Sequence, residues 1–202
     1  RSALTEWHNP TTLGAIDTPS KILNAMLAGV NSRSSGLSAL DVGAMHSQTH
    51  FVQDILMMIG GGSASTAGGV KVTTFAVLVL AVIAEARGDR DIETFGRRIP
   101  TSTIRLSVAV SLLGLALVAI SVVLLMSMTD YTLDIILFET VSAFATVGLS
   151  TGITPILPVG AKYVLIFLMF AGRTGSMTVA AALALRQRSR VIRMPEEQPI
   201  IG

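Results

Sequence analysis

The stretch "ATVGLSTG", residues Ala145–Gly152, lies between a short apolar segment and a long one. It contains no carboxylate, histidine or cysteine, so its chemistry rests on backbone groups and small hydroxyl side chains. A related stretch, "SSGLS" (34–38), occurs 112 residues earlier and aligns with "TVGLS" (146–150). One copy would fit a plain glycine turn between helices.

The sequence after each stretch also repeats. In both copies 24 residues separate the central glycine from a second one, Gly36 from Gly60 and Gly148 from Gly172. The residues around the second glycine match as well, because "LMMIGG" (56–61) aligns with "LMFAGR" (168–173). Such spacing predicts an internal repeat, in which a short helix, a glycine turn, a loop and a spanning helix follow one another twice.

The composition is typical of a membrane protein. Of 202 residues, 50% are hydrophobic and 14% are charged, and the mean hydropathy is +0.65. A soluble domain carries about 25% charged residues. The absence of cysteine excludes disulfides and thiolate metal sites. Since the chain begins at Arg1, we expect it to be the C-terminal part of a longer protein.

Apolar segments of two lengths alternate along the chain. A bilayer crossing needs about 20 apolar residues, and three segments reach that length: Leu106–Met128, Tyr163–Leu185 with Arg173 inside it, and Phe51–Ala84, which "GGGSASTAGGVK" (60–71) interrupts. Two shorter segments, 21–30 after Thr18-Pro19 and 133–145, are too short to cross. These predict re-entrant helices.

Arginines predict the orientation. Those between the first two spans and those after the last span lie on one side: Arg87, Arg90, Arg97, Arg98, Arg105, Arg186, Arg188, Arg190 and Arg193. The opposite side, 129–162, offers only Lys162. The positive-inside rule therefore places the arginine-rich loop and the C-terminal tail in the cytoplasm. Topology explains these arginines better than nucleic-acid binding does.

A re-entrant helix that ends in a glycine turn can bind a cation. Irregular backbone at membrane depth is tolerated where it lines a cavity or is buried in protein. A row of carbonyl oxygens there can replace the hydration shell of a monovalent ion, and the negative ends of the short helices favour positive charge. Divalent cations usually recruit carboxylates, and neither stretch contains one.

These motifs resemble the Trk/Ktr/HKT superfamily of potassium transporters, and the resemblance covers nearly the whole chain. The quoted segments that carry it are "LTEWHNPTTLG" (4–14), "NSRSSGLSALD" (31–41), "GGGSASTAGGVKVTT" (60–74), "FETVSAFATVGLSTGITP" (138–155), "FAGRTGSMT" (170–178) and "PEEQPIIG" (195–202). The resemblance implies an all-α membrane protein with four outer helix–pore helix–inner helix units, of which this chain holds two.

The implied boundaries are as follows. Residues 1–99 form the third unit without its outer helix, with a pore helix near 19–30, a filter at 34–38 and a broken inner helix near 46–86. Residues 100–202 form the fourth, with an outer helix near 103–128, a pore helix at 133–145, a filter at 146–150 and an inner helix near 160–186. The ion would contact the filter residues Ser34, Ser35, Gly36, Leu37, Thr146, Val147, Gly148 and Leu149.

The resemblance also implies a substrate, partners and a location. Potassium would be the transported ion, with no organic cofactor. The partners would be membrane lipid, a second copy in a homodimer, and a cytosolic nucleotide-binding regulatory ring, in a prokaryotic cell membrane. A sodium-permeable transporter of the same fold stays open, because the chain holds only two of four filters. An intramembrane enzyme or a non-conducting scaffold is the alternative from another class.

Two features are candidate gates below the filter. Arg173 is costly inside a span, and it either borders the conduction path or forms an ion pair with Glu139 or Asp54. Five glycines in Gly60–Gly69 disfavour a helix, so this glycine-rich loop could block the pore and move aside. Lys71 either anchors the loop or extends towards the cytoplasm. The gate candidates are Arg173, Gly60, Gly61, Gly62, Ser63, Ser65, Thr66, Gly68, Gly69 and Lys71.

Three other sequence features give weaker indications of function. His46 and His50 have the i, i+4 spacing of metal ligands, but the sequence positions no third ligand beside them. The residues around Lys71 do not form a P-loop, since Val70 precedes it and Val72 follows it. Trp7 and Tyr131 suit the membrane interface.

Overall fold

Helices dominate the computed structural model, in keeping with the all-α membrane class expected from the sequence. The structure describes residues 6–7, 9–32, 35–62, 68–88, 92–94 and 97–175. The longer helices are α2 (Thr18–Asn31), α3 (Ser47–Met58), α4 (Val72–Arg87), α5 (Thr101–Met128), α6 (Leu133–Phe144) and α7 (Val159–Phe170). The structure also contains two short 3-10 turns, η1 (Leu13–Ala15) and η2 (Val42–Ala44), and a π-helical turn (Ala171–Gly175). Two short strands, β1 (Glu93–Thr94) and β2 (Arg97–Arg98), form a hairpin.

Helix α5 sets the long dimension of the molecule. Its 28 residues extend about 42 Å at 1.5 Å per residue, which exceeds a hydrocarbon core of about 30 Å. In the described part of the chain, α5 is the one helix long and apolar enough to cross a membrane. Helix α7 packs against it. The expected span Tyr163–Leu185 is described only as far as Gly175.

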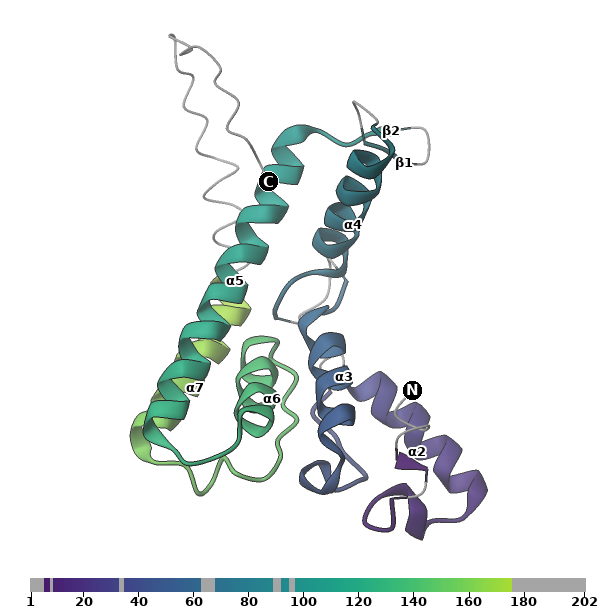
Figure 1. Ribbon diagram of the computed structural model, residues 1–202, viewed down its shortest axis with the longest axis vertical. Helices are drawn as coiled ribbons and strands as arrows, with labels where there is room; N and C mark the ends of the chain where they lie inside the picture. Colours follow the sequence, from purple (N-terminus) through teal and green to yellow (C-terminus); the bar gives the residue numbers. More distant parts are fainter. Residues whose placement is uncertain are drawn as a thin grey trace.

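The predicted break in the long apolar segment separates α3 from α4, which stand nearly end to end (Figure 1). The two ends of the intervening loop are hydrogen-bonded to each other. The Gly60 amide donates to the Val70 carbonyl at 2.9 Å, and the Val72 amide donates to the Gly61 carbonyl at 3.2 Å. These bonds satisfy backbone groups that an apolar setting would leave unpaired.

Both short apolar segments form helices that are too short to cross a bilayer. Helix α2 has 14 residues and begins at Thr18, with Pro19 in its first turn as the sequence indicates. Helix α6 has 12 residues, a length of about 18 Å. In Figure 1, α6 lies between α3 on one side and the α5–α7 pair on the other.

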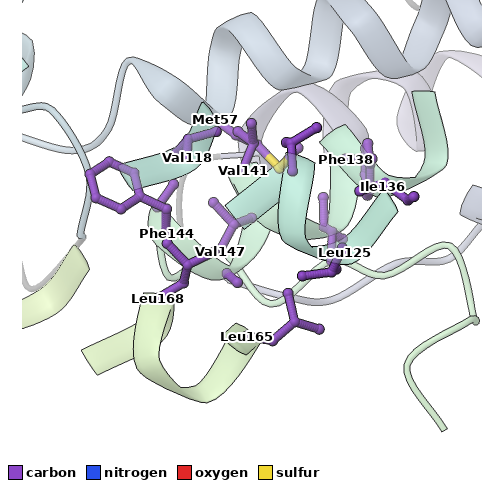
Figure 2. Packing of buried hydrophobic residues seen from close by; sticks show 14 of the residues in the cluster. Met57, Val118, Leu125, Ile136, Phe138, Val141, Phe144, Val147, Leu165 and Leu168 are labelled. Atoms are coloured by element: carbon purple, nitrogen blue, oxygen red, sulfur yellow. The ribbon is translucent and has the colours of Figure 1, made fainter. Parts of the chain in front are cut away.

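The hydrophobic core surrounds α6, as Figure 2 shows. Phe138 and Ile136 of this helix are completely buried, among Met57 of α3, Leu125 of α5 and Leu168 of α7. Close packing of such side chains stabilises the arrangement through many van der Waals contacts. This packing holds α6, and therefore the chain that follows it, in a fixed position.

Candidate functional site

The chain turns sharply where α6 ends. Thr146 has a φ of 53°, in the left-handed region, which a β-branched residue adopts only when its surroundings impose it, at a cost of about 1–3 kcal/mol. Two backbone hydrogen bonds impose this turn, from the Thr146 amide to the Ala143 carbonyl at 3.2 Å and from the Val147 amide to the Ser142 carbonyl at 3.0 Å. Helix α6 therefore leads directly into the stretch 146–150.

The two glycine turns of the internal repeat lie against each other. Gly36 and Gly148 both have positive φ angles, 62° and 88°. A Cβ added at Gly36 would lie 3.0 Å from the Val147 carbonyl oxygen and 3.4 Å from the Gly148 Cα. Only glycine permits both the backbone angle and this approach. Segments that are 112 residues apart in sequence therefore meet backbone to backbone.

Equivalent carbonyls in the two turns receive equivalent hydrogen bonds. The Ser142 hydroxyl donates to the Leu149 carbonyl at 2.6 Å, and the Asn31 amide donates to the Leu37 carbonyl. Leu37 and Leu149 occupy the same place in the repeat. In each case a side chain at the end of the preceding short helix fixes the orientation of a peptide in the turn. Of the expected filter residues, Ser34 lies outside the described part.

Glu139 holds the segment that follows the second turn. Its carboxylate is buried on α6 and accepts hydrogen bonds from the Ser150 hydroxyl at 2.7 Å, the Thr151 amide at 2.8 Å and the Thr151 hydroxyl at 2.9 Å. The Thr154 hydroxyl donates to it at 3.0 Å. Sequence reasoning considered Glu139 only as a partner for Arg173. The sequence signal for this role is the one carboxylate in the apolar helix beyond its first turn, where Asp134 lies, shortly before a run of hydroxyl residues.

A cleft of about 400 Å³ runs from the second turn to Arg173. Thr146, Gly148 and Glu139 line it together with Arg173. Arg173 lies in the π-helical turn that follows α7, a feature found frequently at functional sites and not predicted from the sequence. Of the two proposed ion-pair partners, Glu139 shares the cleft, whereas Asp54 is buried on α3.

The described end of the glycine-rich loop packs under the same turn. The Gly68 amide donates to the Thr146 hydroxyl at 2.8 Å, and the Gly69 amide donates to the Gly172 carbonyl at 3.3 Å. The other described end, Gly60–Gly62, pairs with the start of α4, where Lys71 is the half-buried N-cap residue. The remaining gate candidates, Ser63, Ser65 and Thr66, lie outside the described residues.

The two histidines with the spacing of metal ligands, His46 and His50, both contact other parts of the fold. The His50 Nε2 atom lies 2.7 Å from the Val42 carbonyl oxygen. His46 precedes α3 as its N-cap residue, and its amide donates to the Glu6 carboxylate at 2.9 Å. Within the described part, no group of three His, Cys, Asp or Glu side chains could hold a metal ion.

A membrane-length apolar helix, two short helices and two glycine turns in contact are the features expected of the class of helical membrane transport proteins. Comparison with known families gives the particular family. The model of the TrkH family, described as a cation transport protein, matches residues 3–191. The chain therefore belongs to the TrkH family of cation transporters, within the Trk/Ktr superfamily that the motifs resemble.

Individual relatives support this membership. The chain is 36% identical over 199 residues to the Ktr system potassium uptake protein B of Vibrio alginolyticus, covering 98% of this chain and 44% of that protein. It is 38% identical over 197 residues to the protein of the same name from Bacillus subtilis, with the same coverage of each chain. The potassium/sodium uptake protein NtpJ of Enterococcus hirae is 33% identical over 189 residues, covering 90% of this chain and 42% of that protein.

These relatives are transporters and not enzymes, which excludes the enzyme alternative. The chain spans less than half the length of each of the three. The activity of the whole protein is therefore a matter for proposal.

Proposed function

We propose that this chain forms half of the ion pathway in a potassium-uptake protein, with the stretches 34–38 and 146–150 as two filter segments. The observation that carries the proposal is the contact between Gly36 and Gly148, which brings the two repeated turns to one place. Backbone carbonyls arranged around one point can replace the hydration shell of a monovalent cation. Two further filter segments, from outside this chain, would complete the ring.

We propose potassium as the transported ion. The two turns offer carbonyl and hydroxyl oxygens, and a site without a ring of carboxylates disfavours divalent cations. The names of the Ktr relatives specify potassium. The name of the Enterococcus relative includes sodium as well, so a sodium-permeable transporter is the second candidate.

We assign gating to Arg173 and the glycine-rich loop. In its described part the loop contacts both Thr146 and Gly172. In the proposed orientation this contact would lie at the intracellular end of the second filter segment. Arg173 lines the cleft that reaches this segment. A fixed positive charge there raises the barrier to a cation. Because Arg173 carries that barrier, Arg173→Ala is expected to raise ion flux, and parental flux would argue against its gating role.

The assembly and orientation follow the charge distribution. The ends of α4 and α5 and the β1–β2 hairpin meet at one end of the molecule (Figure 1). Arg87, Arg97, Arg98 and Arg105 lie on these elements. We assign this end to the cytoplasm, where it offers a docking surface for a nucleotide-binding regulatory ring. The complete subunit would pair with a second copy in the membrane of a prokaryotic cell.

The filter assignment is tested by Gly148→Ser in the full-length protein. A side chain at φ 88° strains the turn, and its Cβ would lie 3.4 Å from the Gly36 Cα. We expect weaker discrimination between potassium and sodium, measured as growth of a potassium-uptake-deficient strain at low potassium with and without added sodium. The control is Gly29→Ser, because no atom lies within 4 Å of a Cβ at Gly29. Growth and sodium sensitivity equal to the parent would exclude the assignment.

A further inference from the structure

The hydroxyl group of Thr146 links the second filter segment to the glycine-rich loop. It accepts a 2.8 Å hydrogen bond from the amide of Gly68, which is 78 residues away in sequence. Both residues are inside the protein, since Gly68 is buried and Thr146 is half-buried. In such a setting a backbone amide without a partner is costly. The described end of the loop is therefore held by a hydrogen bond to the first residue of the second turn.

The fit at this contact is tight. A Cβ at Gly68 would lie 2.8 Å from the Thr146 methyl carbon, 2.9 Å from its hydroxyl oxygen and 3.0 Å from the Phe144 carbonyl oxygen. Distances of this size require an atom to shift. The neighbouring Gly69 has a φ of 74° and a Cβ there would lie 3.3 Å from the Ala145 Cα. Two consecutive glycines thus allow the loop to approach the end of α6 closely.

We propose that Thr146 acts as a latch, a positioning residue whose hydroxyl holds the described end of the glycine-rich loop in its docked position under the filter. This inference rests on the proposed function, in which the loop obstructs the ion pathway. While the loop is docked, the Thr146 hydroxyl accepts the hydrogen bond from Gly68, and this contact supports the left-handed turn at Thr146. Release of the loop breaks this hydrogen bond and removes the support of the turn, so the conformations of the gate and of the filter change together.

The latch makes a specific prediction about leak through the closed transporter. A hydrogen bond of ordinary net strength shifts an equilibrium about two- to tenfold. Thr146→Val keeps the size and the β-branch but removes the acceptor, and Gly68→Ala pushes the loop away without changing the sequence of the filter. Each is expected to raise regulator-independent potassium flux about two- to tenfold, measured in proteoliposomes containing the full-length protein. Thr146→Ser keeps the acceptor and should raise flux less than Thr146→Val.

The double variant decides whether the two residues act through one contact. Because Gly68→Ala and Thr146→Val break the same hydrogen bond, the double variant should leak no more than the stronger single variant. Effects that multiply would overturn the latch, as would parental flux in folded Gly68→Ala protein. If Gly68→Ala fails to fold, comparison of Thr146→Val with Thr146→Ser decides, and equal flux in that pair overturns the proposal. Gly29→Ala, which changes a glycine with open space around it, is the control.

Failure of the latch can be told apart from failure of the filter assignment. Gly148→Ser is measured in the same proteoliposomes for the ratio of potassium to sodium flux. A changed ratio in Gly148→Ser together with parental leak in the latch variants would reject the latch alone. A parental ratio in Gly148→Ser would reject the filter assignment, and with it the role given to Thr146.

Discussion

At the scale of the residue, Gly36 and Gly148 form the contact between the two repeated turns. Their φ angles of 62° and 88° disfavour a side chain at both positions, and at Gly36 a Cβ would also lie 3.0 Å from the Val147 carbonyl oxygen. Thr146 adopts a similar angle with a β-branched side chain, and it does so where α6 and the loop both hydrogen-bond to it. Backbone geometry, more than side-chain chemistry, defines this site.

Glu139 is expected to support the second filter segment through its carboxylate. Glu139→Gln exchanges one acceptor oxygen for an amide group, which cannot accept the hydrogen bonds of Thr154 or its neighbours. Leaving buried groups unpaired costs about 1–3 kcal/mol. We expect a lower melting temperature of the purified protein and a reduced potassium-to-sodium flux ratio. Glu93→Gln, at an exposed position in the hairpin, is the matched control, and equal behaviour of the two variants would contradict the role.

Glu6 predicts a pH dependence of stability. Burial alone raises the pKa of this carboxyl, but hydrogen bonds from Thr49, Thr12, the His46 amide and Asn9 outweigh burial and hold the pKa below its ordinary value of 4.5. The unfolded chain therefore binds the proton more readily than the folded protein does. The stabilisation from Glu6 is complete above pH 4.5 and is lost as the pH falls through the lowered pKa.

Thermal unfolding of the parent and of Glu6→Gln measures this effect. At neutral pH the variant should melt at a lower temperature, because the amide replaces an ionised acceptor. The difference should narrow as the pH falls below 4.5. A difference that stays constant between pH 7 and pH 3.5 would show that Glu6 remains protonated or ionised in both states.

At the scale of the element, α6 and α2 are related by the repeat but packed differently. Helix α6 is enclosed by α3, α5 and α7, whereas α2 exposes large apolar side chains such as Leu23, Met26 and Val30. Exposed apolar surface of this extent marks a contact with protein or lipid. Helix α2 thus presents the face on which further chain or membrane would pack.

The junction between α7 and the π-helical turn predicts an asymmetric response to two similar substitutions. A Cβ at Gly172 would lie 1.8 Å from the Phe144 carbonyl oxygen, whereas a Cβ at Gly175 meets no atom within 4 Å. Gly172→Ala should therefore destabilise the protein by about 1–3 kcal/mol or more, and Gly175→Ala should leave its melting temperature nearly unchanged. Equal melting temperatures for the two variants would contradict the close packing of α6 on this turn.

The sequence predicts elements more readily than contacts between them. Apolar length and Thr18-Pro19 indicate where the helices lie, because these signals are local. The glycine-rich "GGGSASTAGGVK" likewise indicates the break between α3 and α4. Three features depend on residues distant in sequence, and no local pattern specifies them. They are the π-helical turn at Arg173, the hydrogen bonds to the Glu139 carboxylate and the hydrogen bond from Gly68 to Thr146. The repeat alone gives a long-range prediction, the equivalence of Gly36 and Gly148.

At the scale of the whole molecule, the parts converge on one region. The turns that follow α2 and α6 contact each other, and the described end of the glycine-rich loop is hydrogen-bonded both to the second turn and to the π-helical turn. The arginine-bearing hairpin lies at one end and the connection from α6 to α7 at the other. Such a division suits a membrane protein with its ion site at membrane depth and its regulatory surface in water.

The most direct test of the filter is a crystal structure of the full-length protein grown with rubidium, a congener of potassium with strong anomalous scattering. We predict an anomalous peak beside the contact between Gly36 and Gly148, within coordination distance of backbone carbonyl oxygens from both segments, and its retention when sodium is present in excess over rubidium. Rubidium bound elsewhere, with no peak at this contact, would contradict the assignment of the two glycine turns to a potassium filter.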